Sequence, residues 1–226
     1  MNWEFIRQSI PLYQEAFLLT LIIAFWGILG AFFVGLLVSV IRHYRIPILQ
    51  QLSTIYIEFS RNTPLLIQLF FLYFGFPRLG IVLSSQTCAI IGLIFLGGSY
   101  MAESFRSGFE AVPSSQIELA TSIGLSPLQS FRYVILPQAL AISLPSFSAN
   151  IIFLLKETSV FSAVALADLM YVAKDLIGLY YETDEALFML VIAYLILLLP
   201  LSLAFSLIER RLRFAGFGNT STLSGK

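Results

Sequence analysis

The sequence has few charged side chains, one cysteine and one histidine among its 226 residues. Charged residues make up 12% of the chain, about half their share in an ordinary soluble domain. Thirteen basic and thirteen acidic residues cancel, so the chain lacks the basic surface that nucleic-acid binding requires. The single cysteine, Cys88, excludes an internal disulfide, and we expect it to fill space within an apolar run.

The sequence also lacks the motifs of several enzyme classes. Its one histidine, His43, has arginines close on both sides and is expected to be solvated, which disfavours an intramembrane hydrolase. No H-E-x-x-H or paired-cysteine spacing indicates a metal site. No G-x-x-x-x-G-K-[ST] loop is present to hold ATP. We therefore expect no catalytic residues, metal or cofactor in this chain.

What the chain has in abundance is apolar sequence: 58% of its residues are hydrophobic and the mean hydropathy is +0.87. Membrane-spanning helices need about 20 apolar residues. Four uncharged runs reach that length, namely 16–41, 79–102, 133–155 and 186–208. The first is too long for a cleaved signal peptide, so we expect a mature membrane helix there.

A fifth crossing is predicted between the first and second of these runs. Residues 62–77 are short for a span, but they extend back through residues 55–57 if Glu58 and Arg61 reach the interface or the protein interior. The predicted fold is therefore an all-α polytopic membrane protein with about five transmembrane helices. It forms a single permease-like domain, 1–226, and we expect residues 218–226, which are polar and glycine-bearing, to be a disordered tail.

Basic residues indicate the orientation, because cytoplasmic loops carry an excess of Lys and Arg. They follow the first run, flank the loop after the third predicted span and follow the last run, at Arg42, Arg45, Arg106, Arg132, Arg210, Arg211 and Arg213. The opposite side has fewer basic residues. The bias predicts an external N-terminus and a cytoplasmic C-terminus, which agrees with an odd number of crossings.

The polar segment 114–137 lies between two apolar runs and is predicted to be a cytoplasmic docking loop. Ser115 and Glu118 have the S-x-x-E spacing of a capping box, which predicts a short helix that starts at Gln116. Gly124 can end this helix, because glycine adopts the positive φ that a side chain resists.

A second short helix is predicted directly after the glycine. Ser126 and Gln129 repeat the capping spacing as S-x-x-Q, and Pro127 occupies the first helical position, where its missing N–H costs nothing. Pro137 is expected to end this segment. The loop is thus predicted to present two short helices that meet at a glycine.

The loop resembles the cytoplasmic "EAA" signature of ABC importer permeases. The matching residues are Glu118, Ala120 and Gly124, then after nine residues Val134, Leu136 and Pro137. Leu119 stands where the family usually has a second alanine, and Val134 where it usually has isoleucine; both keep an apolar surface. Segments 61–68 (RNTPLLIQ), 100–106 (YMAESFR), 136–139 (LPQA) and 155–159 (LKETS) are similar to the polar amino acid uptake subfamily, so the resemblance covers nearly the whole chain.

This resemblance implies a permease subunit of an ATP-driven importer for glutamine-, cystine- or arginine-like amino acids in the bacterial plasma membrane. It implies a second permease copy, either identical or a close paralogue, and an extracytoplasmic amino acid-binding protein. It also implies two cytoplasmic ATPase subunits, which would hold ATP and Mg. The residues expected to couple to the ATPase are Glu118, Ala120, Gly124, Leu128, Phe131 and Pro137.

Polar residues within the apolar runs are candidates for the substrate path, because a charge at membrane depth must be paired or face water. Glu103 and Glu157 are acids able to bind a substrate ammonium. Alternatively, Glu103 pairs with Arg106 one turn on, and Lys156 extends to the interface. A broken helix near residues 63–64 would expose further backbone donors. The candidates are Gln68, Glu103, Asn150, Glu157, Thr158 and Ser159. An ion- or proton-coupled secondary transporter would use the same acids and is the alternative function.

Overall fold

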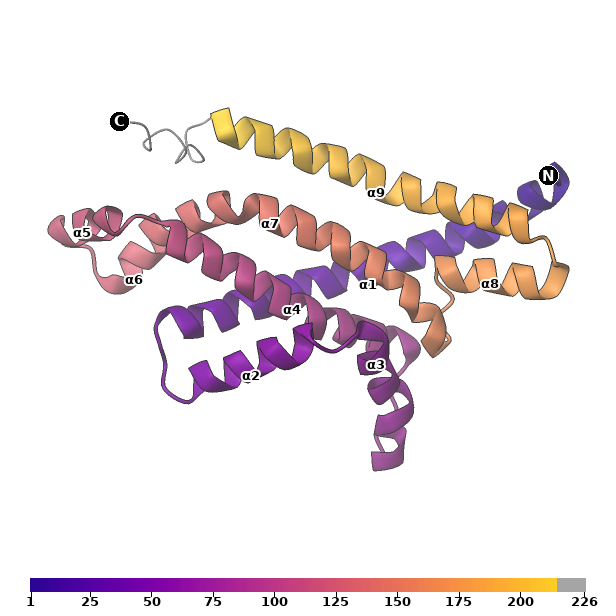
Figure 1. Ribbon diagram of the computed structural model, residues 1–226, viewed down its shortest axis with the longest axis horizontal. Coiled ribbons are helices and arrows are strands. Elements are labelled where there is room, and N and C mark those ends of the chain that lie inside the picture. Colours follow the sequence, from indigo (N-terminus) through magenta and orange to yellow (C-terminus); the bar gives the residue numbers. More distant parts are fainter. Residues whose placement is uncertain (215–226) are drawn as a thin grey trace.

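The computed structural model describes residues 1–214, which fold into helices without a strand (Figure 1). Within these residues, four helical stretches are long and apolar enough to cross a membrane. They are α1 (Trp3–His43), α4 (Ser85–Ala111), the stretch Pro127–Val164 that contains α7 (Leu136–Glu157), and α9 (Thr183–Phe214). The four predicted spans are confirmed. The predicted tail, 218–226, lies outside the described residues.

The helices α1 and α4 pack closely because glycine allows their backbones to approach. A Cβ added to Gly35 would lie 2.5 Å from the Cβ of Met101 and 2.8 Å from the amide nitrogen of Ala102. Fully buried side chains such as Leu93 and Phe105 continue this contact into the main core. The glycines of the first span therefore serve close helix packing.

The segment predicted as a fifth span is a broken helix rather than a continuous one, and its apolar part, Leu65–Leu79, is shorter than the four spans. The helix α2 (Leu49–Arg61) ends before Pro64, since the residue preceding a proline is driven out of the helical region. The chain resumes as α3 (Leu65–Phe70), then a π-helical turn (Phe71–Gly75) and a 3₁₀ turn (Phe76–Leu79). In Figure 1, α3 turns sharply away from the direction of α2.

The two ends of the molecule are built differently. At one end, α8 (Leu169–Tyr180) packs against the first turns of α1 and α9, and Tyr13 Oη donates to the carbonyl of Ala186 at 2.7 Å. At the other end lie α5 (Ser114–Ser122) and α6 (Pro127–Ser130), near the turn between α1 and α2 (Figure 1). The N-terminus lies at the α8 end, opposite the predicted docking loop (Figure 1).

Candidate docking loop and translocation site

The first helix of the docking loop begins earlier than its sequence predicts. It starts at Ser114, with Pro113 as the N-cap and without a side-chain capping bond. The predicted capping box of Ser115 and Glu118 is therefore wrong. Pro113 has φ −62° and ψ 139°, the extended geometry of an N-cap residue, so Ser115 already lies inside the first turn.

The end of α5 matches its prediction. Gly124 has a φ of +83°, and its N–H donates to the carbonyl of Thr121 at 3.0 Å. The next N–H, from Leu125, donates to the carbonyl of Ala120 at 3.1 Å. These two bonds form a Schellman motif, which closes a helix through a left-handed residue. Gly124 is thus a joint that depends on positive φ.

The second helix has its predicted start but not its predicted end. The Ser126 N–H donates to Gln129 Oε1 at 2.8 Å and the Gln129 N–H to Ser126 Oγ at 3.3 Å, so the capping box is confirmed. Pro137 does not end the segment. A π-helical turn, Phe131–Ile135, joins α6 to α7, and Pro137 lies in the first turn of α7, where a missing N–H is tolerated.

The loop presents apolar side chains to its surroundings. Leu119, Ile123 and Leu128 are 61%, 76% and 72% exposed. Glu118 is also exposed, whereas Ala120 is the buried residue of α5. Exposed apolar side chains gathered on a loop of this kind are typical of a protein interface.

A row of aromatic rings connects this loop to the membrane core. Phe131 lies with its ring centroid 5.5 Å from that of Phe109 and 5.8 Å from that of Tyr44. Phe109 is 6.1 Å from Phe105, which is 4.7 Å from Phe147 of α7. The row runs from the turn after α1 and the docking loop along α4 to α7.

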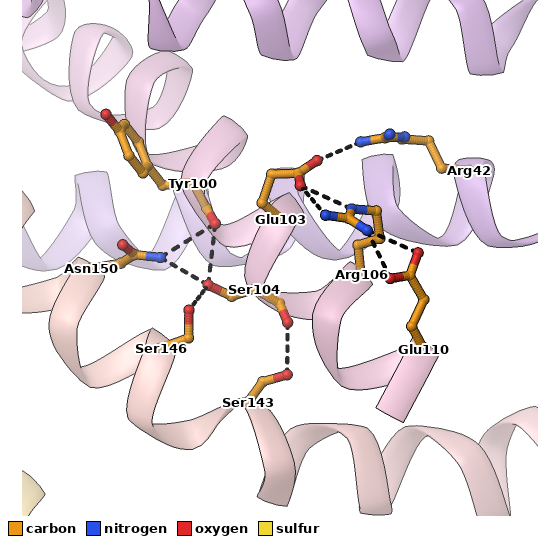
Figure 2. Close-up of polar contacts among 9 residues, drawn as sticks. All are labelled: Arg42, Tyr100, Glu103, Ser104, Arg106, Glu110, Ser143, Ser146 and Asn150. Carbon is orange, nitrogen blue, oxygen red and sulfur yellow. Dashed lines mark hydrogen bonds and ion pairs between the residues drawn. The ribbon is translucent and has the colours of Figure 1, made fainter. Parts of the chain in front are cut away.

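Glu103 belongs to an ion-pair cluster between α1 and α4 (Figure 2). One carboxylate oxygen accepts from Arg42 and the other from Arg106, with an Nη2–Oε2 distance of 2.7 Å. Arg106 also donates to Glu110 at 2.8 Å. The predicted pairing of Glu103 with Arg106 is confirmed, and Arg42 adds a partner 61 positions away in the sequence.

Asn150 lies in a polar seam between α4 and α7 (Figure 2). Its side-chain amide donates to the Ser104 hydroxyl at 2.8 Å and to the Tyr100 carbonyl at 3.3 Å. Ser143 and Ser146 add two more bonds to Ser104, one to its carbonyl at 2.7 Å and one to its hydroxyl at 2.6 Å. The seam ties the two helices together through the donors of Asn150.

Three further candidates bond to nearby backbone. Gln68 donates to the carbonyls of Ser60 and Thr63, at 3.1 and 2.9 Å, and so satisfies the end of α2 at the break. Thr158 is fully buried and donates to a carbonyl of the preceding turn at 2.8 Å. The Ser159 carbonyl accepts a bond of 3.5 Å from Ser162.

A polar pocket of about 300 Å³ opens at the break between α2 and α3. The Arg61 guanidinium lies over the ring of Tyr100, 5.0 Å from its centroid, and Glu157 contributes a carboxylate from the end of α7. Neither charge has an ion-pair partner within the described part of the chain. The pocket is lined by Arg61, Asn62, Thr63, Pro64, Leu65, Leu66, Leu96, Tyr100, Phe153, Glu157 and Val160.

Residues 27–214 match the family described as "Binding-protein-dependent transport system inner membrane component". The chain belongs to this family. The permease is 35% identical to the probable amino-acid permease protein YxeN of Bacillus subtilis, over 93% of its own length and 95% of that relative. It is 30% identical to the glutamine transport system permease protein GlnP of Escherichia coli K12, over 94% and 98% of the two chains.

A solved structure described as an amino acid ABC transporter with histidines has the same fold. It superposes with a TM-score of 0.86 at 30% identity, covering 93% of the permease and 99% of that chain. These matches confirm the resemblance to the polar amino acid subfamily and the multi-pass helical membrane fold. The chain is thus a permease subunit of an ATP-driven importer and not a secondary transporter.

Of the six predicted path residues, only Glu157 lines the pocket of the permease. Glu103, Asn150 and Gln68 are engaged in the contacts described above. Arg61 was expected at the interface or in the protein interior, and Tyr100 was not among the predicted path residues. One feature of the sequence could have indicated Arg61. It is a basic residue three positions before Pro64, where a helix must break, so it lies at the edge of any cavity that the break opens.

Proposed function

We propose that the permease imports a polar, zwitterionic amino acid across a bacterial plasma membrane. It works with a second permease copy, two separate cytoplasmic ATPase subunits and an extracytoplasmic binding protein. The names of its relatives, which include glutamine permeases, support this class of substrate. The description of its family as a component of binding-protein-dependent transport systems supports the kinds of partner.

The distribution of charge supports an external N-terminus and a cytoplasmic C-terminus. Arg42, Arg45, Arg106 and Arg132 all lie at or near the end that carries α5 and α6. Cytoplasmic loops are enriched in such residues. The docking loop then faces the ATPase subunits, and the N-terminal end with α8 faces the binding protein.

The pocket at the helix break is the observation that carries the proposed substrate class. An amino acid has a carboxylate, which the guanidinium of Arg61 can bind, and an ammonium, which the carboxylate of Glu157 can bind. The Tyr100 ring beside Arg61 adds a face that attracts cations. The volume, about 300 Å³, is at the lower end for ligand sites and suits a small solute.

The docking loop supplies the proposed coupling. Its apolar patch, Leu119, Ile123 and Leu128, would dock on the ATPase, and closure of the ATPase pair would move α5 and α6 as a rigid unit. The Phe131 ring would pass this movement to α1 and α4 through its contacts with Tyr44 and Phe109. Rigid-body movement of packed elements is a common way to switch between two states.

The experiment compares uptake by Glu157→Gln, Arg61→Gln and wild-type permease, each reconstituted with its ATPase subunits and binding protein. Loss of one charge-assisted hydrogen bond, worth about 1.5–3 kcal/mol, predicts a roughly ten- to hundredfold rise in KM. Lys156→Gln is the matched control, because Lys156 precedes Glu157 directly, is exposed and does not line the pocket. Basal ATPase activity should stay near wild type in all three variants.

Two results would contradict the proposal. Unchanged uptake in both pocket variants would remove the pocket from the substrate path. Uptake that continues without ATP, or ATP turnover by the purified permease alone, would contradict the proposed division between permease and ATPase subunits.

A further inference from the structure

The outward face of α2 is divided into a polar half and an apolar half. The buried face of α2 consists of Ser53, Ile57 and Ser60. On the opposite side, polar residues recur at steps of three or four, so they fall on one stripe of the helix. The stripe consists of Gln51, Thr54, Glu58 and Asn62, all of them exposed.

The part of this stripe around Glu58 lies at membrane depth. Tyr56 Oη and Ser60 Oγ both donate to the carbonyl of Phe95, at 2.7 and 2.9 Å. Phe95 is near the middle of α4, a 27-residue membrane helix. Glu58 lies between these two α2 residues in the sequence, so its carboxylate is close to the same depth.

An exposed carboxylate at that depth cannot face lipid without a large cost. Glu58 has no ion-pair partner among the side chains described for residues 1–211, and its one side-chain hydrogen bond there is of 3.2 Å from the Asn62 amide. The adjacent apolar half, Leu52, Ile55 and Phe59, is 56%, 64% and 61% exposed. The helix thus offers an apolar side to lipid or protein and a polar side that requires water.

The stripe is continuous with the pocket. Asn62, its last member, is one of the residues that line the pocket at the helix break. Gln51, its first member, lies in the first turn of α2, at the end of the molecule that holds the docking loop (Figure 1). Polar side chains therefore lead from the pocket to the docking-loop end along one helix face.

We propose that this stripe lines the aqueous exit path of the permease, and that Glu58 makes the path unfavourable for anionic amino acids. The inference rests on the proposed function, in which the pocket holds a polar amino acid. A second permease copy would bring a second Glu58 to the same path. Zwitterionic or cationic amino acids then pass, whereas acidic ones meet like charge.

The first test measures labelling by a charged, water-soluble methanethiosulfonate reagent. Thr54→Cys and Ile55→Cys are compared in a Cys88→Ser background, with the permease–ATPase complex in lipid nanodiscs. Both positions are exposed on the same turn, and threonine to cysteine is a small change. Thiolate is the reactive form, and each unit by which apolar surroundings raise a thiol pKa lowers its fraction about tenfold. Thr54→Cys should therefore label at least about tenfold faster than Ile55→Cys.

Equal labelling at the two positions would overturn the proposal, as would faster labelling of Ile55→Cys. Protection of Thr54→Cys by tight packing against the second copy would give slow labelling at both positions and would also overturn it. Labelling does not depend on transport. ATP-independent uptake, with Thr54→Cys still labelled faster than Ile55→Cys, would therefore refute the proposed function. ATP-driven uptake with equal labelling at the two positions would refute only the role of the stripe.

The second test concerns selectivity. Glu58→Gln should raise the uptake of glutamate relative to glutamine several-fold, and Glu58→Asp, which keeps the charge, should not. Equal ratios in wild type, Glu58→Gln and Glu58→Asp would overturn the role of the charge. The same binding protein is used with all three permeases, so the preference of the binding protein affects each ratio equally.

Discussion

Replacement of Gly124 by alanine tests the joint between α5 and α6. Gly124 has a φ of +83°, and a Cβ added there would meet no atom within 4 Å. The substitution therefore adds backbone strain without a steric clash. A residue with a Cβ in the left-handed region is destabilised by roughly 1–2 kcal/mol.

The chain offers two matched controls for this change. Gly80 has a φ of +82° and also has open space around its missing Cβ, so Gly80→Ala adds the same strain away from the docking loop. Gly178 has open space without a positive φ and lies within α8, so Gly178→Ala adds only a methyl group. Gly124→Asn is a milder variant, because asparagine tolerates the left-handed region better than alanine does.

The assay is the affinity of the purified permease for its ATPase subunit, followed by ATP-driven uptake in proteoliposomes. If docking requires the observed joint, about 1–2 kcal/mol of strain weakens assembly roughly 5- to 30-fold. Gly124→Asn should lose less than Gly124→Ala. Gly80→Ala and Gly178→Ala should assemble like wild type.

Wild-type affinity and uptake in Gly124→Ala would refute the role of the joint. An equal loss in Gly80→Ala would show that strain anywhere in the permease has this effect, and the docking interpretation would fail. Membrane insertion of each variant is checked by its yield and thermal stability in detergent, which should not separate Gly124→Ala from Gly80→Ala, the control with the same strain.

Three further predictions concern stability. Gly35→Ala should lower the free energy of unfolding by about 1–3 kcal/mol, because its Cβ would lie 2.5 Å from the Cβ of Met101, whereas Gly75→Ala should not; denaturant titration in detergent distinguishes them. Gln68→Ala should cost about 1–3 kcal/mol by removing the donor from the buried carbonyl of Ser60 and the partly buried carbonyl of Thr63, which is measured as a lower melting temperature. Burial raises the pKa of Asp168, outside the spanning helices, to about 7. The unfolded carboxyl ionises near pH 4, so wild type should lose stability relative to Asp168→Asn as pH rises from about 4 to 7; a constant difference in melting temperature over that range would contradict this.

The spans and the docking loop were predictable because their signals are local. Apolar runs of sufficient length mark membrane helices wherever they pack, and a capping box or a glycine joint involves residues within a few positions. The Ser126 capping box and the Gly124 joint were found for this reason. The predicted box at Ser115 failed for an equally local reason, since Pro113 serves as the N-cap two residues before Ser115 and the helix already starts at Ser114.

Pro137 shows where a local rule is overridden by its context. Proline usually ends a helix because it lacks an N–H and clashes with the preceding turn. Here the π-helical turn Phe131–Ile135 shifts the bonding pattern just before it, and the helix continues to Glu157. The contacts of Phe131 with α1 and α4 hold that turn in place, and no single-segment pattern reports them.

Glu103 and Glu157 show why the candidate site could be only partly predicted. In the sequence, both are acids at the edge of an apolar run, and the cost of a charge there is the same for each. The packing of α1 on α4 brings Arg42 to Glu103, which is then neutralised on both sides. The break at Pro64 instead leaves Arg61 beside the pocket that Glu157 lines, without an ion pair between them. An acid therefore remains available to a solute only where helix packing does not place an arginine against it. Such packing depends on contacts between residues far apart in the chain.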